Sequence, residues 1–294
     1  MAVRTRKAIA SPDLASISGI APLSAASGIL GVRVFDVGQG DAIAILAKVG
    51  GTEQVALQLD YGGRERNPFT TNADVDTRMP VSQNRLLMLT HWDEDHWSSA
   101  PKGSQAKGAK WVVPRQVTSP RAVRFSASLN DIHCIPEKHV GQTIRFTAGN
   151  GDYILAEKIG SFPGAFAKNE DCNKSGVALA IVHRSSNGDE AILLPGDAPF
   201  DKVAPFVRLE KQGVKLRAII AFHHGAGTHW TAATDKLLQN WSRAPILDVV
   251  FSCSRPNSYS HPDDGRYKAL LPGANFHMTA DLRTNAAVSS DILF

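Results

Sequence analysis

The chain has 294 residues, of which 43% are hydrophobic and 20% are charged, with a formal net charge of +4 and a pI near 9.0. This is the composition of an ordinary soluble globular protein. The positive charge slightly favours an anionic partner but does not by itself indicate nucleic acid. The three cysteines, Cys134, Cys172 and Cys253, are widely spaced. They exclude a disulfide framework and a zinc ribbon, so we expect a reducing, cytoplasmic location.

The first 28 residues begin with basic residues but also contain Asp13, several serines and two prolines. These residues interrupt the apolar stretch that a signal peptide needs, which leaves secretion a minor alternative. We expect residues 1–28 to form a flexible leader and residues 29–294 to form one domain. No run approaches the roughly 18 consecutive apolar residues of a membrane helix, so we expect no membrane partner.

The first half of the domain alternates short apolar runs with turns rich in Gly, Asp and Asn, which is typical of strands. The predicted strands span residues 30–37, 41–49, 54–63, 85–90 and 110–114. The first two flank Gly-Gln-Gly and predict a hairpin. The run at 85–90 is continuously apolar, as expected of a strand buried on both faces. A helical segment begins near Ser98.

The second half repeats the same rhythm of strands and helices. Its predicted strands span residues 176–184, 191–197, 215–225 and 246–254, and its predicted helices span residues 198–213 and 231–241. Two strand-rich halves that each contain helices predict an α/β fold. We expect two sheets packed together with helices on the outside.

Polar side chains follow several of these predicted strands at the point where each strand ends. They are His91, Asp93, Asp95, His96, Asp197, His223, His224, Asn257 and His261. In open α/β folds the carboxyl ends of the strands form the ligand crevice, so these four loops should converge there. Imidazole and carboxylate together suit zinc, manganese or iron. The absence of cysteine ligands argues against a closed structural zinc site.

The motifs resemble those of the metallo-β-lactamase superfamily, and more finely its competence-protein branch (the ComEC-like hydrolases). The matching segments are FDVGQGDAI (35–43), LDYGG (59–63), LTHWDEDHW (89–97), NKSGVALAI (173–181), ILLPGD (192–197), FHHGA (222–226) and SRPNSYSHP (254–262). They occur in the expected order between residues 32 and 262. The resemblance implies an αββα sandwich of two mixed sheets packed face to face, with two divalent ions at one edge.

The resemblance also implies roles for individual residues. His91 and Asp93 would bind the first ion, Asp95 and His96 the second, and Asp197 would bridge them. One histidine of the His-His-Gly motif would complete the second site, with His223 favoured and His224 close behind. Asp60 would orient ligands through hydrogen bonds. Asp95, Asp197 and His261 would be the catalytic residues, and Gln39, Asp41, Asn173, Asn257 and His261 would contact the substrate.

Two departures from the wider superfamily bear on the metal. Asp93 stands where the commonest motif has its second histidine, and Asn173 and Ser175 lie where a further histidine is expected. The first site would therefore be richer in oxygen, which argues against specificity for zinc and raises manganese or magnesium as alternatives. We expect two divalent ions, zinc or manganese, with magnesium as a further alternative. These departures argue against β-lactamase activity.

The branch implies hydrolysis of a phosphodiester by a metal-bound hydroxide, with DNA as the expected substrate. A small-molecule phosphodiesterase, esterase or lactonase is the first alternative. A metal-poor pseudo-enzyme that binds nucleic acid or a protein is the second. The segment 64–84 is long enough to act as a lid over a closed pocket, and the sequence leaves these alternatives open. Oligomeric state is not indicated.

Overall fold

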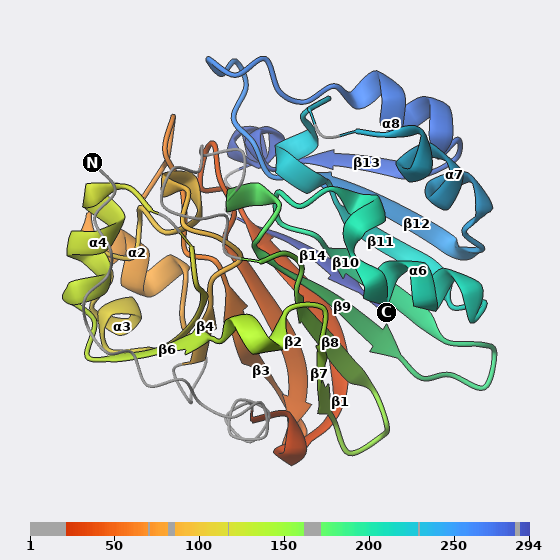
Figure 1. Ribbon diagram of the computed structural model, residues 1–294, viewed down its shortest axis with the longest axis horizontal. Helices are drawn as coiled ribbons and strands as arrows, with labels where there is room; N and C mark the ends of the chain where they lie inside the picture. The colour runs from red at the N-terminus through yellow and green to blue at the C-terminus, as the bar shows by residue number, and fades with distance from the viewer. Residues whose placement is uncertain are drawn as a thin grey trace.

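Two seven-stranded sheets organise the molecule, which we describe from a computed structural model (Figure 1). The structure describes residues 22–69, 71–81, 86–116, 118–161, 172–228, 230–285 and 289–294. Sheet A contains, in spatial order, β14 (Ser289–Leu293), β1 (Ala26–Phe35), β2 (Ile43–Val49), β3 (Thr52–Leu59), β4 (Leu86–Met88), β5 (Lys110–Pro114) and β6 (Asp131–Ile135). Sheet B contains β13 (Asn275–Met278), β12 (Arg243–Phe251), β11 (Lys215–Ile220), β10 (Glu190–Leu194), β9 (Val177–His183), β8 (Tyr153–Lys158) and β7 (Thr143–Thr147).

Both sheets change from antiparallel to parallel pairing in the same way. Strands β14, β1, β2 and β3 are antiparallel neighbours, and pairing is parallel from β3 through β6. In sheet B, pairing is antiparallel from β7 to β10 and parallel from β10 to β13. Parallel strands end at the same edge of a sheet. The loops that follow β3, β4, β10, β11 and β12 can therefore meet.

Helices cover the outer face of each sheet, as Figure 1 shows. Sheet A carries α2 (Asn72–Arg78), α3 (Ser104–Lys107) and α4 (Pro120–Ala127), whose apolar residues share a buried cluster with β4 and β5. Sheet B carries α6 (Ala204–Lys211), α7 (Ala232–Asn240) and α8 (Asp264–Leu270) in a second cluster. Short 3₁₀ turns complete the fold: η1 (Pro22–Ala25), η2 (Glu94–His96), η3 (Glu137–His139), η4 (Phe200–Lys202), η5 (Phe222–Gly225) and η6 (Thr279–Asn285).

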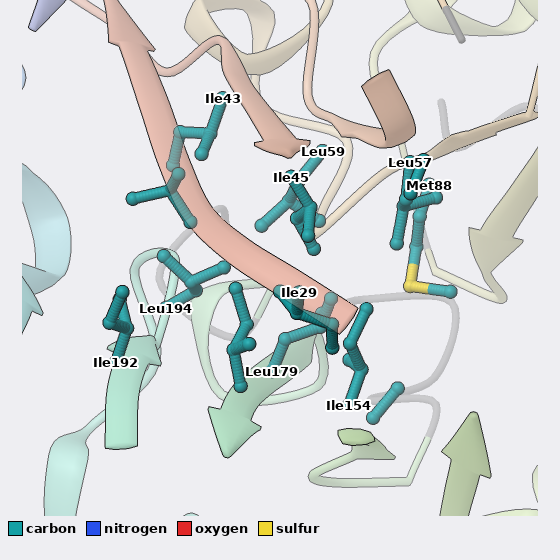
Figure 2. Close-up of a cluster of buried hydrophobic side chains, with 14 of the residues drawn as sticks. Ile29, Ile43, Ile45, Leu57, Leu59, Met88, Ile154, Leu179, Ile192 and Leu194 are labelled. Atoms are coloured by element: carbon teal, nitrogen blue, oxygen red, sulfur yellow. The ribbon is translucent and has the colours of Figure 1, made fainter. Parts of the chain in front are cut away.

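A third apolar cluster lies between the sheets (Figure 2). Ile43 and Ile45 of sheet A and Ile154, Leu179 and Ile192 of sheet B are each at most 2% exposed. Burial of such a side chain contributes about 1.5–3 kcal/mol, so this layer holds the sheets face to face. The predicted fold class, an α/β protein with two mixed sheets and outer helices, is confirmed.

The structure corrects or extends the fold prediction in three places. Residues 22–28, which we assigned to the leader, form η1 and the start of β1, and Leu23 is buried in the core. A lid role for the segment 64–84 stays a prediction, but its described part has regular structure. It contains α2, which is capped by Thr71 and tied to α3 through Asp76. The sequence pattern did not predict eight further elements: β6, β7, β8, β13, β14, α2, α4 and α8.

In the described part of the chain, no helix has both the length and the apolar character needed to cross a membrane.

Candidate metal centre

A cavity of about 300 Å³ opens where the loops after β3 and β4 of sheet A meet those after β10, β11 and β12 of sheet B. The lining includes Gln39, Asp93, Asp95, Asp197, His223 and His224. These residues come from four regions of the sequence that the motif analysis singled out. The structure therefore brings the predicted loops together at one edge of the two sheets.

Asp197, 3% exposed, lies at the centre of four imidazole rings. Its Oδ1 is 3.2 Å from Nε2 of His96 and 3.7 Å from Nε2 of His224. Its Oδ2 is 3.5 Å from Nε2 of His91 and 3.6 Å from Nε2 of His223. Each carboxylate oxygen thus faces two imidazole nitrogens, which is the geometry a bridging ligand requires.

Two further carboxylates complete two sets of donors around Asp197. Oδ2 of Asp93 is 3.5 Å from Nε2 of His91, and Oδ2 of Asp95 is 3.3 Å from Nε2 of His224. We call His91, Asp93, His223 and Oδ2 of Asp197 the first ligand set. The second ligand set is Asp95, His96, His224 and Oδ1 of Asp197.

This division differs from one expectation about the His-His-Gly motif. His223 was favoured for the second site, but its Nε2 faces the Asp197 oxygen that also faces His91. His224 occupies the position expected of His223. The first ligand set therefore contains two imidazoles, although the sequence suggested that it would be poor in nitrogen.

The backbone of the His-His-Gly motif explains how two adjacent residues serve two ligand sets. His223 (φ 47°, ψ 46°) and His224 (φ 55°, ψ 22°) are both left-handed, and Gly225 follows at φ 86°. Left-handed backbone costs a non-glycine residue roughly 1–2 kcal/mol. Such strain is commonly retained at functional sites. Thr228 orients the His223 ring through a 3.0 Å contact between its Oγ1 and Nδ1.

Asp60 fixes the ring of His96 from behind. Its Oδ2 is 2.8 Å from Nδ1 of His96, and its carboxylate accepts hydrogen bonds from the backbone N–H and the hydroxyl of Thr90. The side chain is fully buried, and burial raises the pKa of Asp60 against the opposing effect of His96. Since Nδ1 is engaged by Asp60, Nε2 of His96 is directed at Asp197, as expected of a residue that orients a ligand.

Two glycines allow neighbouring turns to approach the loop that carries Asp95. The backbone N–H groups of Asp41 and Gly63 donate to the carbonyl oxygen of Asp95. A Cβ at Gly40 would lie 2.1 Å from that oxygen, and one at Gly62 would lie 1.7 Å from it. The Gly-Gln-Gly-Asp and Asp-Tyr-Gly-Gly motifs thus act as a backbone support for the metal-binding loop.

Asp41 has a different place from the one expected of it. Asp41, His96, Asp197 and His224 are all buried and offer ligand atoms within 4.8 Å of one another. However, Asp41 lies near the Nδ1 atoms, 3.6 Å from that of His224 and 3.8 Å from that of His96. The Nε2 atoms of both rings face Asp197 instead. We therefore assign Asp41 to orienting His224, the position that Asp60 has for His96, and not to substrate contact.

Several buried polar atoms of the centre lack a hydrogen bond among the described residues. They are Oδ1 of Asp197, Oδ1 of Asp41, Nε2 of His91, Nε2 of His96, and both ring nitrogens of His224. Most buried polar atoms in proteins have a hydrogen-bond partner, so this concentration of exceptions requires an explanation. Nitrogen and oxygen donors that converge in this way fit divalent cations.

The histidines and carboxylates of the centre shift one another's pKa values. Burial and His96 lower the pKa of His91, but Asp197 and Asp93 outweigh them and raise it to about 9. Burial likewise opposes the ionisation of Asp197, yet the surrounding histidines hold its pKa well below the usual value. Burial lowers the pKa of His223, in contrast to that of His91. Since an imidazole nitrogen must be unprotonated to bind a cation, cation binding at this centre would compete with protons.

Only some of the predicted substrate-contacting residues line the cavity. Gln39 lines the cavity, and its side-chain oxygen has no hydrogen bond with any described residue. His261 also lines the cavity, where burial, with His223 and His224, lowers its pKa to about 4, so the ring is neutral. Asn173 is buried and is not among the residues that line the cavity. The amide of Asn257 is used within its own loop, with bonds to Ser254, Tyr259 and His261.

Two functional residues were missed by the sequence analysis. The Thr90 hydroxyl lies 3.1 Å from Nδ1 of His91 and 3.2 Å from Nδ1 of His96. Gln116 accepts a hydrogen bond from the backbone of Trp92 and donates to the carbonyl of Cys172, which ties the metal-binding loop to the neighbouring segment. The position of Thr90 immediately before His91 was the available signal. Gln116 gave none.

No protein-family model matches the chain, and no curated protein sequence matches it. Among solved structures, the Rm3 metallo-beta-lactamase is 13% identical, with 71% of this chain and 81% of that chain covered at a TM-score of 0.35. The FEZ-1 metallo-beta-lactamase from Legionella gormanii is 11% identical, with coverages of 76% and 77% and a TM-score of 0.33. A protein of unknown function from Enterococcus faecalis V583 is 9% identical, with coverages of 85% and 76% and a TM-score of 0.36. TM-scores this low assign neither a family nor an activity.

Proposed function

We propose that this protein is a metal-dependent hydrolase of the metallo-β-lactamase superfamily, and that it cleaves phosphodiester bonds, with DNA as its substrate. The observation that carries the proposal is the position of Asp197 between two ligand sets, with two imidazoles at each oxygen. Divalent cations at such a pair of sites supply a nucleophile at neutral pH and stabilise the charge that develops on the oxygens around phosphorus.

The protein's own residues would hold and orient this centre. The first ligand set would hold one cation and the second ligand set the other, with Asp197 shared. Asp60 and Asp41 would fix the two rings of the second set through their Nδ1 atoms. His261 at the cavity wall would present a neutral ring to the substrate. Each set offers two nitrogens and two carboxylates, which favours zinc or manganese over magnesium.

The preference for a phosphodiester rests on charge and on the resemblance of the motifs. A centre that holds two cations attracts an anionic oxygen, and the chain carries a net charge of +4. A small ester is the second candidate, and the cavity volume of about 300 Å³ favours it, because only one substrate unit fits at a time. A DNA strand also fits this volume if only its end or a single nucleotide enters the cavity. A cytoplasmic location remains a prediction.

The test compares Asp197→Asn with Asp131→Asn, a control at an exposed carboxylate of β6. We would measure metal content by elemental analysis, and the cleavage of single-stranded DNA, duplex DNA and a small phosphodiester in the presence of Zn²⁺, Mn²⁺ or Mg²⁺. We expect Asp197→Asn to lose bound metal and to lose turnover by orders of magnitude, while Asp131→Asn retains both. Turnover of the small ester alone would transfer the proposal to the second candidate. Wild-type protein with no metal and no turnover would contradict both and favour a binding protein.

A further inference from the structure

The ring of Tyr259 lies at the cavity and is open to solvent. Its exposed fraction is 41%, and among the described residues no other Phe, Trp or Tyr is so exposed. A single exposed aromatic side chain needs no explanation elsewhere on a protein surface. Tyr259, however, lines the same cavity as Asp197 and both histidines of the His-His-Gly motif.

The ring also belongs to a continuous row of rings that leads to the metal centre. Tyr259 and His261 are stacked with an interplanar angle of 17° and ring centroids 6.0 Å apart. His261 in turn meets His223 edge to face, with centroids 5.5 Å apart. Because His223 belongs to the first ligand set, Tyr259 lies two ring contacts from the place where the bond would be cleaved.

The loop that carries Tyr259 is anchored on both sides of the residue. Oδ1 of Asn257 accepts hydrogen bonds from the backbone N–H groups of Tyr259 (3.0 Å) and His261 (3.2 Å). The backbone N–H of Ser258 donates to Oε2 of Glu65 at 2.9 Å, and the Ser258 hydroxyl donates to the same carboxylate. An anchored loop loses little conformational entropy when a flat group stacks on its ring.

A positive charge stands at the rim of the same cavity. Arg64 lines the cavity, is exposed, and forms no ion pair with any described residue. Its backbone N–H donates to the carbonyl of Gln39, which fixes the start of the side chain. A guanidinium and an exposed aromatic ring that line one cavity are groups that proteins use to hold a phosphate and a base of a single strand.

We infer that Tyr259 stacks the base next to the scissile phosphate while Arg64 contacts a neighbouring phosphate, so that the substrate is single-stranded DNA or a frayed end. This inference rests on the proposed function and names its substrate class. A base inside a duplex is stacked on both faces and cannot reach Tyr259. The protein should therefore cleave unpaired strands in preference to duplexes.

The experiment combines variants of Tyr259 with oligonucleotides that either carry or lack bases. Tyr259→Ala and the matched control Tyr259→Phe would be titrated by fluorescence anisotropy with a labelled phosphorothioate oligothymidylate, which resists hydrolysis, and with the same oligonucleotide carrying abasic sites. We expect Tyr259→Ala to bind the intact oligonucleotide about 5- to 100-fold more weakly, the usual effect of removing one stacking ring. Tyr259→Phe should bind like wild type, and neither variant should differ from wild type on the abasic strand.

Equal weakening on intact and abasic strands would overturn the inference, because the effect would then not depend on a base. Faster cleavage of duplex than of single strands by the wild-type protein would overturn it too. Wild-type protein that takes up cations and hydrolyses a small phosphodiester, but binds neither oligonucleotide, would refute the base subsite alone. The proposed function fails separately, when the wild-type protein hydrolyses no ester at all.

Discussion

Sheets A and B follow the same strand-pairing pattern, yet the aspartates at equivalent positions in the two sheets have different surroundings. Asp60 follows β3 and Asp197 follows β10, the strands at which each sheet changes from antiparallel to parallel pairing. Both carboxylate oxygens of Asp60 are engaged by Thr90, and Oδ2 also by Nδ1 of His96. Asp197 has an oxygen without any hydrogen bond among the described residues. One carboxylate supports the centre and the other is left for a cation.

The histidine-bearing segments after β4 and β11 differ in how their backbone is held. Residues 90–97 are held by hydrogen bonds and by the glycine turns that contact the Asp95 carbonyl. The His-His-Gly motif after β11 is held in a strained left-handed conformation, and His224 has no hydrogen bond at either ring nitrogen in the described structure. Both segments contain buried imidazole nitrogens without a hydrogen bond in the described structure, so the difference between them lies in the backbone. The sheet A segment is supported by hydrogen bonds to its carbonyl groups, whereas the sheet B motif is held in a strained left-handed conformation.

The largest effect that tests this comparison should come from the two histidines of sheet B. We expect wild-type protein to bind two cations, and His223→Ala and His224→Ala each to lose one of the two, because each ligand set loses one of its two imidazoles. Isothermal titration with Zn²⁺ or Mn²⁺ would show which binding event disappears. The two variants are each other's control. If both variants lose the same event, the division of the histidines between the ligand sets is wrong.

The next effect concerns the rigidity of the sheet A segment. In Gly62→Ala the new Cβ would lie 1.7 Å from the Asp95 carbonyl oxygen, so the turn must move. We expect a loss of about 3 kcal/mol in the free energy of unfolding, at the upper end of the usual cost of overpacking. Urea denaturation of the metal-free protein would measure it. Gly265→Ala is the control, because Gly265, like Gly62, is not left-handed, and its added Cβ would meet no atom closer than 3.9 Å. Similar losses in both variants would contradict a specific contact with Asp95.

The smallest effect separates the two orienting carboxylates. Asp60→Asn should weaken cation binding by about 10- to 100-fold, the usual range for a residue that orients a ligand. Asp41→Asn should weaken it less, because Asp41 is 3.6–3.8 Å from the imidazole nitrogens whereas Asp60 is 2.8 Å from His96. Competition with a fluorescent chelator would measure both affinities. A larger loss in Asp41→Asn than in Asp60→Asn would make Asp41 a direct ligand.

The buried central strands could be predicted from the sequence more readily than the strands at the edges of the sheets. The apolar runs of β4, β5, β9 and β10 predicted buried strands because burial on both faces leaves a continuous pattern. Strand β7 alternates buried and exposed residues over only five positions, which gave no comparable signal. The roles of Asp41 and of the two adjacent histidines depend on ring orientation and on left-handed backbone. Ring orientation and left-handed backbone cannot be inferred from the residue types alone.

The bonds between Glu65 and Ser258 act as a cross-brace at the cavity mouth. Glu65 lies after β3 of sheet A and Ser258 lies after β12 of sheet B, and Arg66 adds a hydrogen bond to the Arg255 carbonyl. Hydrogen bonds from Ser258 lower the pKa of Glu65, so the brace persists into mildly acidic solution. Any movement that separates the loop after β3 from the loop after β12 would therefore have to break these hydrogen bonds.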